Sequence, residues 1–63
     1  MKALEGSERF FMVYSEVPID ERKSVVVVID NEPISWNIAY QEIKNNTERG
    51  EKILNILKKL EII

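Results

Sequence analysis

The chain contains no cysteine and no histidine among its 63 residues. Without thiols it forms no disulfide, and without thiolate or imidazole ligands the common structural zinc sites are excluded. The missing imidazole also removes the most frequent general base and the usual switch near neutral pH. From these absences we expect no bound metal, no cofactor and no enzymatic activity.

Long apolar runs and a strong charge imbalance are also missing. No stretch approaches the roughly 20 apolar residues of a membrane span, and residues 1–6 lack the apolar core of a signal peptide. The 9 basic and 11 acidic residues give a formal net charge of -2, which argues against wrapping a bare duplex. The sequence therefore predicts a soluble, cytoplasmic protein without membrane contact.

Residues 24–30 carry the strongest structural signal, four consecutive valines followed by an isoleucine. Such β-branched side chains are stiff at χ1 and favour a strand. Because the run does not alternate with polar residues, we expect both of its faces to be covered, one by the helices and the other face, or the edge, by another chain. Residues 9–15 are also rich in aromatic and aliphatic side chains, and we predict that they form a second strand. The connection over residues 16–23 is short enough to make the two strands antiparallel neighbours.

The pattern after Pro33 predicts a helix. Ser35 is a good N-cap candidate, and Asn45 and Asn46 are plausible stop residues because asparagine tolerates the left-handed conformation. Between them, apolar residues recur at the i, i+3, i+4, i+7 spacing of one helix face. These residues are Trp36, Ala39, Tyr40 and Ile43.

A second helix is predicted to begin at Thr47 as its N-cap. Acidic residues follow in the first turn, and Lys58 and Lys59 come near the end, as the helix dipole favours. Gly50 weakens this prediction slightly because glycine is a poor helix former. The apolar face is formed by Ile53, Leu54, Ile56, Leu57 and Leu60.

The predicted fold is a small single α+β domain over residues 1–63, in which an antiparallel β-hairpin packs against two C-terminal helices (β-β-α-α). A third short strand is possible at either end, over residues 2–5 or 61–63. In size and element order the chain resembles the short β-β-α proteins of thermophilic archaea. Its content of 32% charged residues, without cysteine, fits a heat-adapted source.

Aromatic and basic side chains are the candidate partner contacts. Phe10 and Phe11 are adjacent, so on a strand only one of them faces inward and the other is available to a partner. Trp36 and Tyr40 either form a stacking platform or pack on the sheet, and we favour packing. The full candidate set is Phe10, Phe11, Tyr14, Trp36, Tyr40, Arg49, Lys52, Lys58 and Lys59.

Two other features have a structural and a functional interpretation. Asp30 and Glu32 follow the valine strand, where paired carboxylates bind a hard cation or, more commonly, serve turn chemistry. The basic residues of the C-terminal half touch phosphates or, as we favour, form an ordinary solvated helix face among interleaved glutamates.

We predict from these observations a non-enzymatic interaction module, best described as a small accessory protein that docks on a larger ribonucleoprotein assembly such as the ribosome. RNA phosphate contacts are possible in that setting. The alternative is a self-associating, homodimeric domain in which two copies cover the valine strand with the same patch used twice. An enzyme is the third and least favoured interpretation, because a chain this short has little room for a pocket of the usual ~300 Å³ or more.

Overall fold

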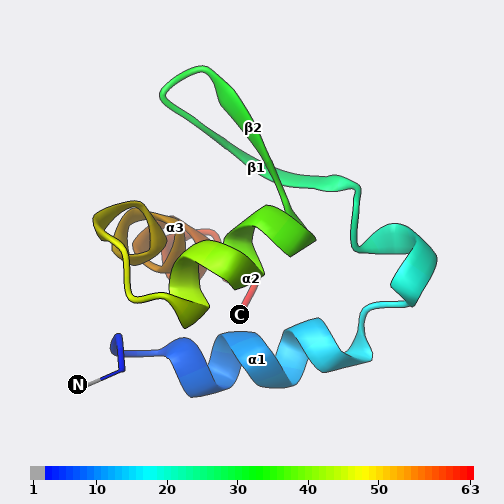
Figure 1. Cartoon of the computed structure of the whole chain (residues 1–63), viewed down its shortest axis with the longest axis horizontal. Coiled ribbons are helices and arrows are strands. Elements are labelled where there is room, and N and C mark those ends of the chain that lie inside the picture. The colour runs from blue at the N-terminus through cyan, green and yellow to red at the C-terminus, as the bar shows by residue number, and fades with distance from the viewer. Residues whose placement is uncertain (1–2) are drawn as a thin grey trace.

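A computed structural model describes residues 3–63 of the chain. In this range it contains the helices α1 (Ser7–Glu16), α2 (Trp36–Lys44) and α3 (Glu48–Lys59), the short 3-10 helix η1 (Ile19–Glu21), and the strands β1 (Val25–Ile29) and β2 (Glu32–Ser35). Figure 1 shows α2 in the middle of the molecule, with α1 on one side of it and the hairpin β1–β2 on the other. The predicted class, a small α+β domain with an antiparallel hairpin followed by two helices, is confirmed.

The prediction of a strand over residues 9–15 is wrong, because this segment lies within α1. In the helix, Phe10, Phe11 and Tyr14 fall on one face and Met12 on the opposite one, where it is 64% exposed. The aromatic residues have a strand preference in isolation, but packing of their common face against α2 overrides it. The spacing Ser7, Phe10, Phe11, Tyr14 is itself the helical i, i+3, i+4, i+7 pattern and is the signal that the strand interpretation missed.

The valine run does form a strand, but its partner differs from the predicted one. β1 pairs antiparallel with β2, with Ile29 opposite Glu32 and Val28 opposite Pro33. The turn consists of Asp30 (φ 52°) and Asn31 (φ 66°), and two successive positive φ values define the type I′ turn that suits a two-residue hairpin. Pro33, which precedes the predicted helix, is inside β2. The sheet has two strands, and the possible third strand is absent from residues 3–63; residue 2 of the proposed N-terminal segment lies outside the described range.

Both predicted helix starts are confirmed. The Ser35 hydroxyl accepts a hydrogen bond from the Ile38 N–H at 3.1 Å, and the Thr47 hydroxyl accepts one from the Gly50 N–H at 2.9 Å. Each bond satisfies one of the amide groups that a helix N-terminus leaves without an intrahelical partner. The two hydroxyl side chains therefore determine where α2 and α3 begin.

Both helices end in the same backbone arrangement. After α2, the Thr47 N–H donates to the Glu42 carbonyl and the Asn46 N–H to the Ile43 carbonyl, each at 3.1 Å. Asn46 has a φ of 55°, as predicted for a stop residue. This is a Schellman motif, and residues 57–62 repeat it at the end of α3. There Glu61 occupies the left-handed position with a φ of 57°, where a non-glycine residue costs about 1–2 kcal/mol.

Gly50 has a packing role that its helix propensity does not reveal. A Cβ atom at this position would lie 2.6 Å from the Glu42 carbonyl oxygen and 2.8 Å from its carbon. These atoms belong to α2, so only glycine lets the two helix backbones approach this closely. The residue that weakened the prediction of α3 is thus the one that allows α3 to pack against α2.

One core joins all the helices and the hairpin. Every element except η1 contributes a buried apolar side chain. Full burial of a valine, leucine, isoleucine or phenylalanine side chain stabilises a fold by about 1.5–3 kcal/mol. The C-terminal residues Ile62 and Ile63 are half-buried against this core without forming a helix or strand. The buried apolar residues are Phe10, Val27, Ile29, Ile34, Ala39, Ile43, Ile53, Leu54 and Leu57.

Candidate interaction surface

The outer face of the hairpin is apolar and exposed. Val27, Ile29 and Ile34 point into the core, whereas Val28 is 61% exposed and Val25 is 56% exposed. Pro33, opposite Val28, is exposed as well. The helices cover the inner face of the valine run, as expected, and cover of the outer face by another chain stays a prediction.

A bulge explains why Val25 and Val28, an odd number of positions apart, share one face. Val25 is opposite Ser35 and Val27 is opposite Ile34, so Val26 is an extra residue in β1. An extra residue shifts the alternation of the strand by one position. Val25 and Val28 consequently lie in the same phase of the ladder, on the same face.

The two outer edges of the sheet differ. A two-residue turn makes Ile29 and Glu32 a hydrogen-bonded pair, so the next pair, Val28 and Pro33, is a non-hydrogen-bonded one. In such a pair the N–H and C=O groups of both residues point away from the opposite strand. Proline has no N–H, so the β2 edge lacks a donor at Pro33, whereas the β1 edge presents both groups of Val28.

Two exposed ion pairs join the hairpin to α3. Arg49 contacts the Glu32 carboxylate at 2.5 Å, and Lys52 approaches Asp30 at 3.8 Å. These contacts occupy two of the basic side chains predicted to reach a partner, and they also occupy the two carboxylates considered as a cation site. Among the described residues, no group of three or more acidic side chains is close enough together to hold a metal ion.

The aromatic residues form one cluster at the interface between α1 and α2. Phe10 is fully buried at its centre and contacts Phe11, Tyr14 and Trp36, with ring centroids 5.7–6.0 Å apart. Tyr40 stacks on Tyr14 at 4.6 Å and meets Phe11 edge to face at 5.6 Å. Trp36 and Tyr40 therefore pack, as we favoured, with their rings against the aromatic side chains of α1.

The stacked tyrosines are covered on their outer sides. The Arg22 guanidinium lies 4.4 Å from the Tyr14 ring centroid, and the Lys44 ammonium lies 5.7 Å from that of Tyr40. The Tyr14 hydroxyl also donates a hydrogen bond to the Asn37 side chain at 2.8 Å. With Tyr40 on one face of Tyr14 and Arg22 on the other, a nucleic-acid base would have to displace one of them to stack there.

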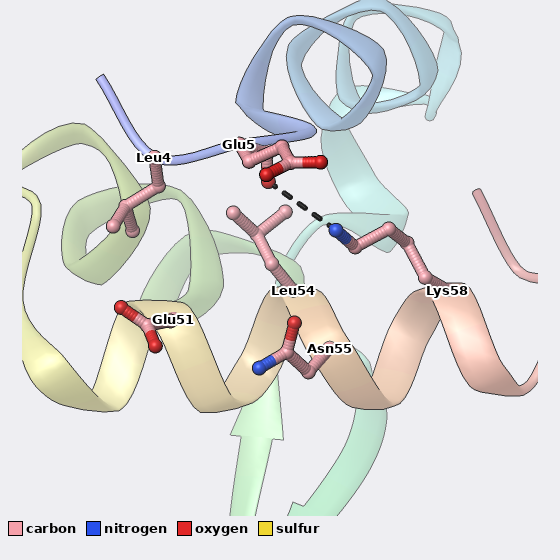
Figure 2. A pocket seen from close by; sticks show the side chains of 6 residues that line it. All are labelled: Leu4, Glu5, Glu51, Leu54, Asn55 and Lys58. Carbon is pink, nitrogen blue, oxygen red and sulfur yellow. Dashed lines mark hydrogen bonds between the residues drawn. The ribbon is translucent and has the colours of Figure 1, made fainter. Parts of the chain in front are cut away.

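The remaining two basic candidates lie at the C-terminal end of α3. Lys58 donates a hydrogen bond to the Glu5 carbonyl oxygen at 3.4 Å, beside a depression of about 390 Å³, and Lys59 is exposed. Figure 2 shows this depression, with Leu54 at its centre and the polar side chains around it. Those polar residues, Glu5, Glu51, Asn55 and Lys58, are all exposed, so water competes with any ligand for them.

The sequence-based prediction named the aromatic residues and expected a second copy on the valine strand, but it assigned this strand the wrong partner within the chain and did not list Val25 and Val28 among the candidate residues. The dipeptide Asp30-Asn31 between two β-branched or apolar segments was the signal for this hairpin, since both residues tolerate positive φ. Within residues 3–63 no helix is both long enough and apolar enough to cross a membrane. No protein-family model, curated protein or solved structure shows significant similarity to this chain.

Proposed function

We propose that this protein is a non-enzymatic interaction module that binds its partner by adding a strand to the open edge of β1. The observation that carries the proposal is the position of Val28. Its side chain is 61% exposed, and its N–H and C=O point away from β2. A strand of β-branched residues with such an edge is a ready template for another extended chain.

Strand addition accounts for the difference between the two edges. In this mode of recognition, main-chain hydrogen bonds supply affinity and alternate side chains supply specificity. Pro33 disfavours pairing at β2, and proteins commonly protect an edge in this way. The ion pairs from Arg49 and Lys52 hold the hairpin turn against α3, so β1 meets a partner as an already formed strand.

A ribonucleoprotein such as the ribosome remains the proposed host predicted from the sequence. Its support is the small size of the chain and the absence of thiol and imidazole groups. The basic side chains give it less support, since Arg49 and Lys52 already pair with acidic residues of the hairpin. Co-sedimentation of the native protein with ribosomal particles supports this host, and recovery only as free protein contradicts it.

Site-specific photo-crosslinking in the cells of origin tests the module itself. A photoreactive amino acid replaces Val28 in one variant and Met12 in a control variant; both residues are more than 60% exposed, but Met12 lies on α1. We expect a discrete protein adduct from position 28 that is absent from position 12. No adduct at position 28, or the same adducts at both positions, contradicts the proposal.

A further inference from the structure

We infer that the strand added to β1 is β1 of a second copy of this chain, giving an antiparallel four-stranded sheet in the order β2, β1, β1, β2. This inference rests on the proposed function and names its partner. It follows from the fact that β1 is complementary to itself in three independent respects when the second strand runs antiparallel: backbone phase, exposed side chains and charge.

The first respect is the phase of the backbone groups. Val28 is in a non-hydrogen-bonded pair, and its amide and carbonyl face the open edge. Val25, opposite Ser35, lies two ladder pairs from Val28 and is therefore in the same phase, and the bond to the chain after β2 is made by the preceding residue, whose carbonyl (Ser24) accepts from the Trp36 N–H at 3.4 Å. Val25 and Val28 thus both present a donor and an acceptor to an incoming strand.

The second respect is the match of exposed side chains. If Val25 of one copy lies opposite Val28 of the other, a two-fold axis between Val26 and Val27 repeats the same pair on the other side. Because the bulge lies between Val25 and Val28 in both copies, the distance between these two residues is the same in both strands, and the extra residue does not disturb the pairing. The two most exposed valines become cross-strand neighbours, an arrangement in which β-branched residues pack well.

The third respect is charge. In this register Lys23 of one copy is opposite Asp30 of the other. Both side chains are exposed, and Asp30, which Lys52 of its own chain approaches at 3.8 Å, is 79% exposed and accessible to a second cation. A parallel arrangement would instead bring Lys23 near Lys23 and Asp30 near Asp30, which like-charge repulsion disfavours. The opposite charges at the two ends of β1 therefore select the antiparallel orientation and fit a second copy of the same strand.

The area available sets the strength of the association. One five-residue strand with its exposed side chains is less than the about 800 Å² per partner of a standard stable interface. The dimer accordingly belongs to the weak, reversible class, with a monomer fraction that grows on dilution. Measurements must cover a wide range of protein concentration to detect it.

Cysteine crosslinking tests the register directly, because the natural chain has no thiol. Val25→Cys and Val28→Cys are made as separate, differently tagged variants. Opposed residues in a hydrogen-bonded pair lie about 5.5 Å apart between Cα atoms, within the range of a disulfide. Two copies of Val28→Cys place their thiols about 10 Å apart along the strands, too far to bond.

We expect mild oxidation of the mixture to give the mixed disulfide well above its random share, whereas Met12→Cys gives no preferred dimer. Sedimentation equilibrium supplies the second readout. The natural chain and Met12→Lys should show the same concentration-dependent dimer, and Val28→Lys should lose it, with circular dichroism verifying that both variants are folded. Random disulfide pairing, or a monomer at every concentration, overturns the inference.

The outcomes also separate this inference from the proposed function. A monomeric chain that still crosslinks through position 28 to a different protein overturns only the identity of the partner. A monomeric chain without any adduct at position 28 overturns both. A dimer that Val28→Lys does not weaken shows that the copies associate elsewhere, and it too overturns the inference.

Discussion

The aromatic segment of α1 and the valine run of β1 were both predicted as strands, and they end in opposite states. In the α1–α2 interface the aromatic rings contact one another, and cations cover the outer sides of the tyrosine stack. In the hairpin, the valines of one face and the backbone of one edge are left exposed. The apolar side chains of the first region are packed within the chain, whereas those on the outer face of the second remain exposed, and this contrast is the reason we propose the hairpin as the interaction surface.

The largest effect on stability is expected from Phe10→Ala, which leaves a cavity at the centre of the interface between α1 and α2. Phe10 is fully buried, and such a truncation costs about 3–5 kcal/mol of the free energy of unfolding. For a domain of this size that is a large part of the total stability. Urea denaturation should show a mostly unfolded chain, while Phe10→Leu, which keeps more of the volume, remains folded. An unchanged midpoint for Phe10→Ala would mean that the aromatic cluster is not part of the core.

A smaller loss of stability is expected from Arg22→Ala, which removes the guanidinium that lies over the Tyr14 ring. Arg22 stacks on Tyr14 and donates hydrogen bonds to the carbonyl groups of Val17 at 3.0 Å and Ser15 at 3.4 Å. Removing these contacts should lower the free energy of unfolding by about 1–2 kcal/mol. Lys59→Ala, at an exposed basic position, is the matched control and should change it little. Equal effects from the two variants would contradict the covering role of Arg22.

The ion pair between Arg49 and Glu32 attaches the hairpin to α3, and breaking it should lower the free energy of unfolding by less than Arg22→Ala does. Both side chains are well exposed, 38% and 63%, so Arg49→Gln is expected to cost about 0.2–1 kcal/mol at low salt. Salt screens exposed charges, so the difference from the natural chain should shrink as ionic strength rises. Thermal unfolding at two salt concentrations measures both effects. A salt-independent difference would indicate that packing, not charge, holds the hairpin turn on α3.

The smallest effect on stability is expected from Val28→Lys, on the open face itself. An exposed position away from the core usually changes the free energy of unfolding by less than about 0.5 kcal/mol. Denaturation at a concentration low enough to keep the chain monomeric should therefore match the natural protein. Together with Phe10→Ala this variant sharpens the contrast, since a large loss at Val28 would show that the outer face is already buried.

Local signals were sufficient for α2, α3 and β1. Ser35 and Thr47 cap helices through their own hydroxyls, and Asn46 ends one through its own backbone preference. These interactions involve residues a few positions apart, so the pattern that encodes them is continuous in the sequence. Local signals were less informative about exposure, because the predicted partner set includes the fully buried Phe10 and does not include the exposed Val25 and Val28.

The amino-acid order by itself determined that the valine run is extended and that two capped, amphipathic helices follow it, because those choices depend on side-chain stiffness and nearby hydrogen bonds. The tertiary structure decided that residues 7–16 are helical, that β2 and not this segment pairs with β1, and that Gly50 marks the closest approach of α2 and α3. Those outcomes depend on contacts between segments distant in the chain. Only their combined packing leaves one valine face and one strand edge outside the core.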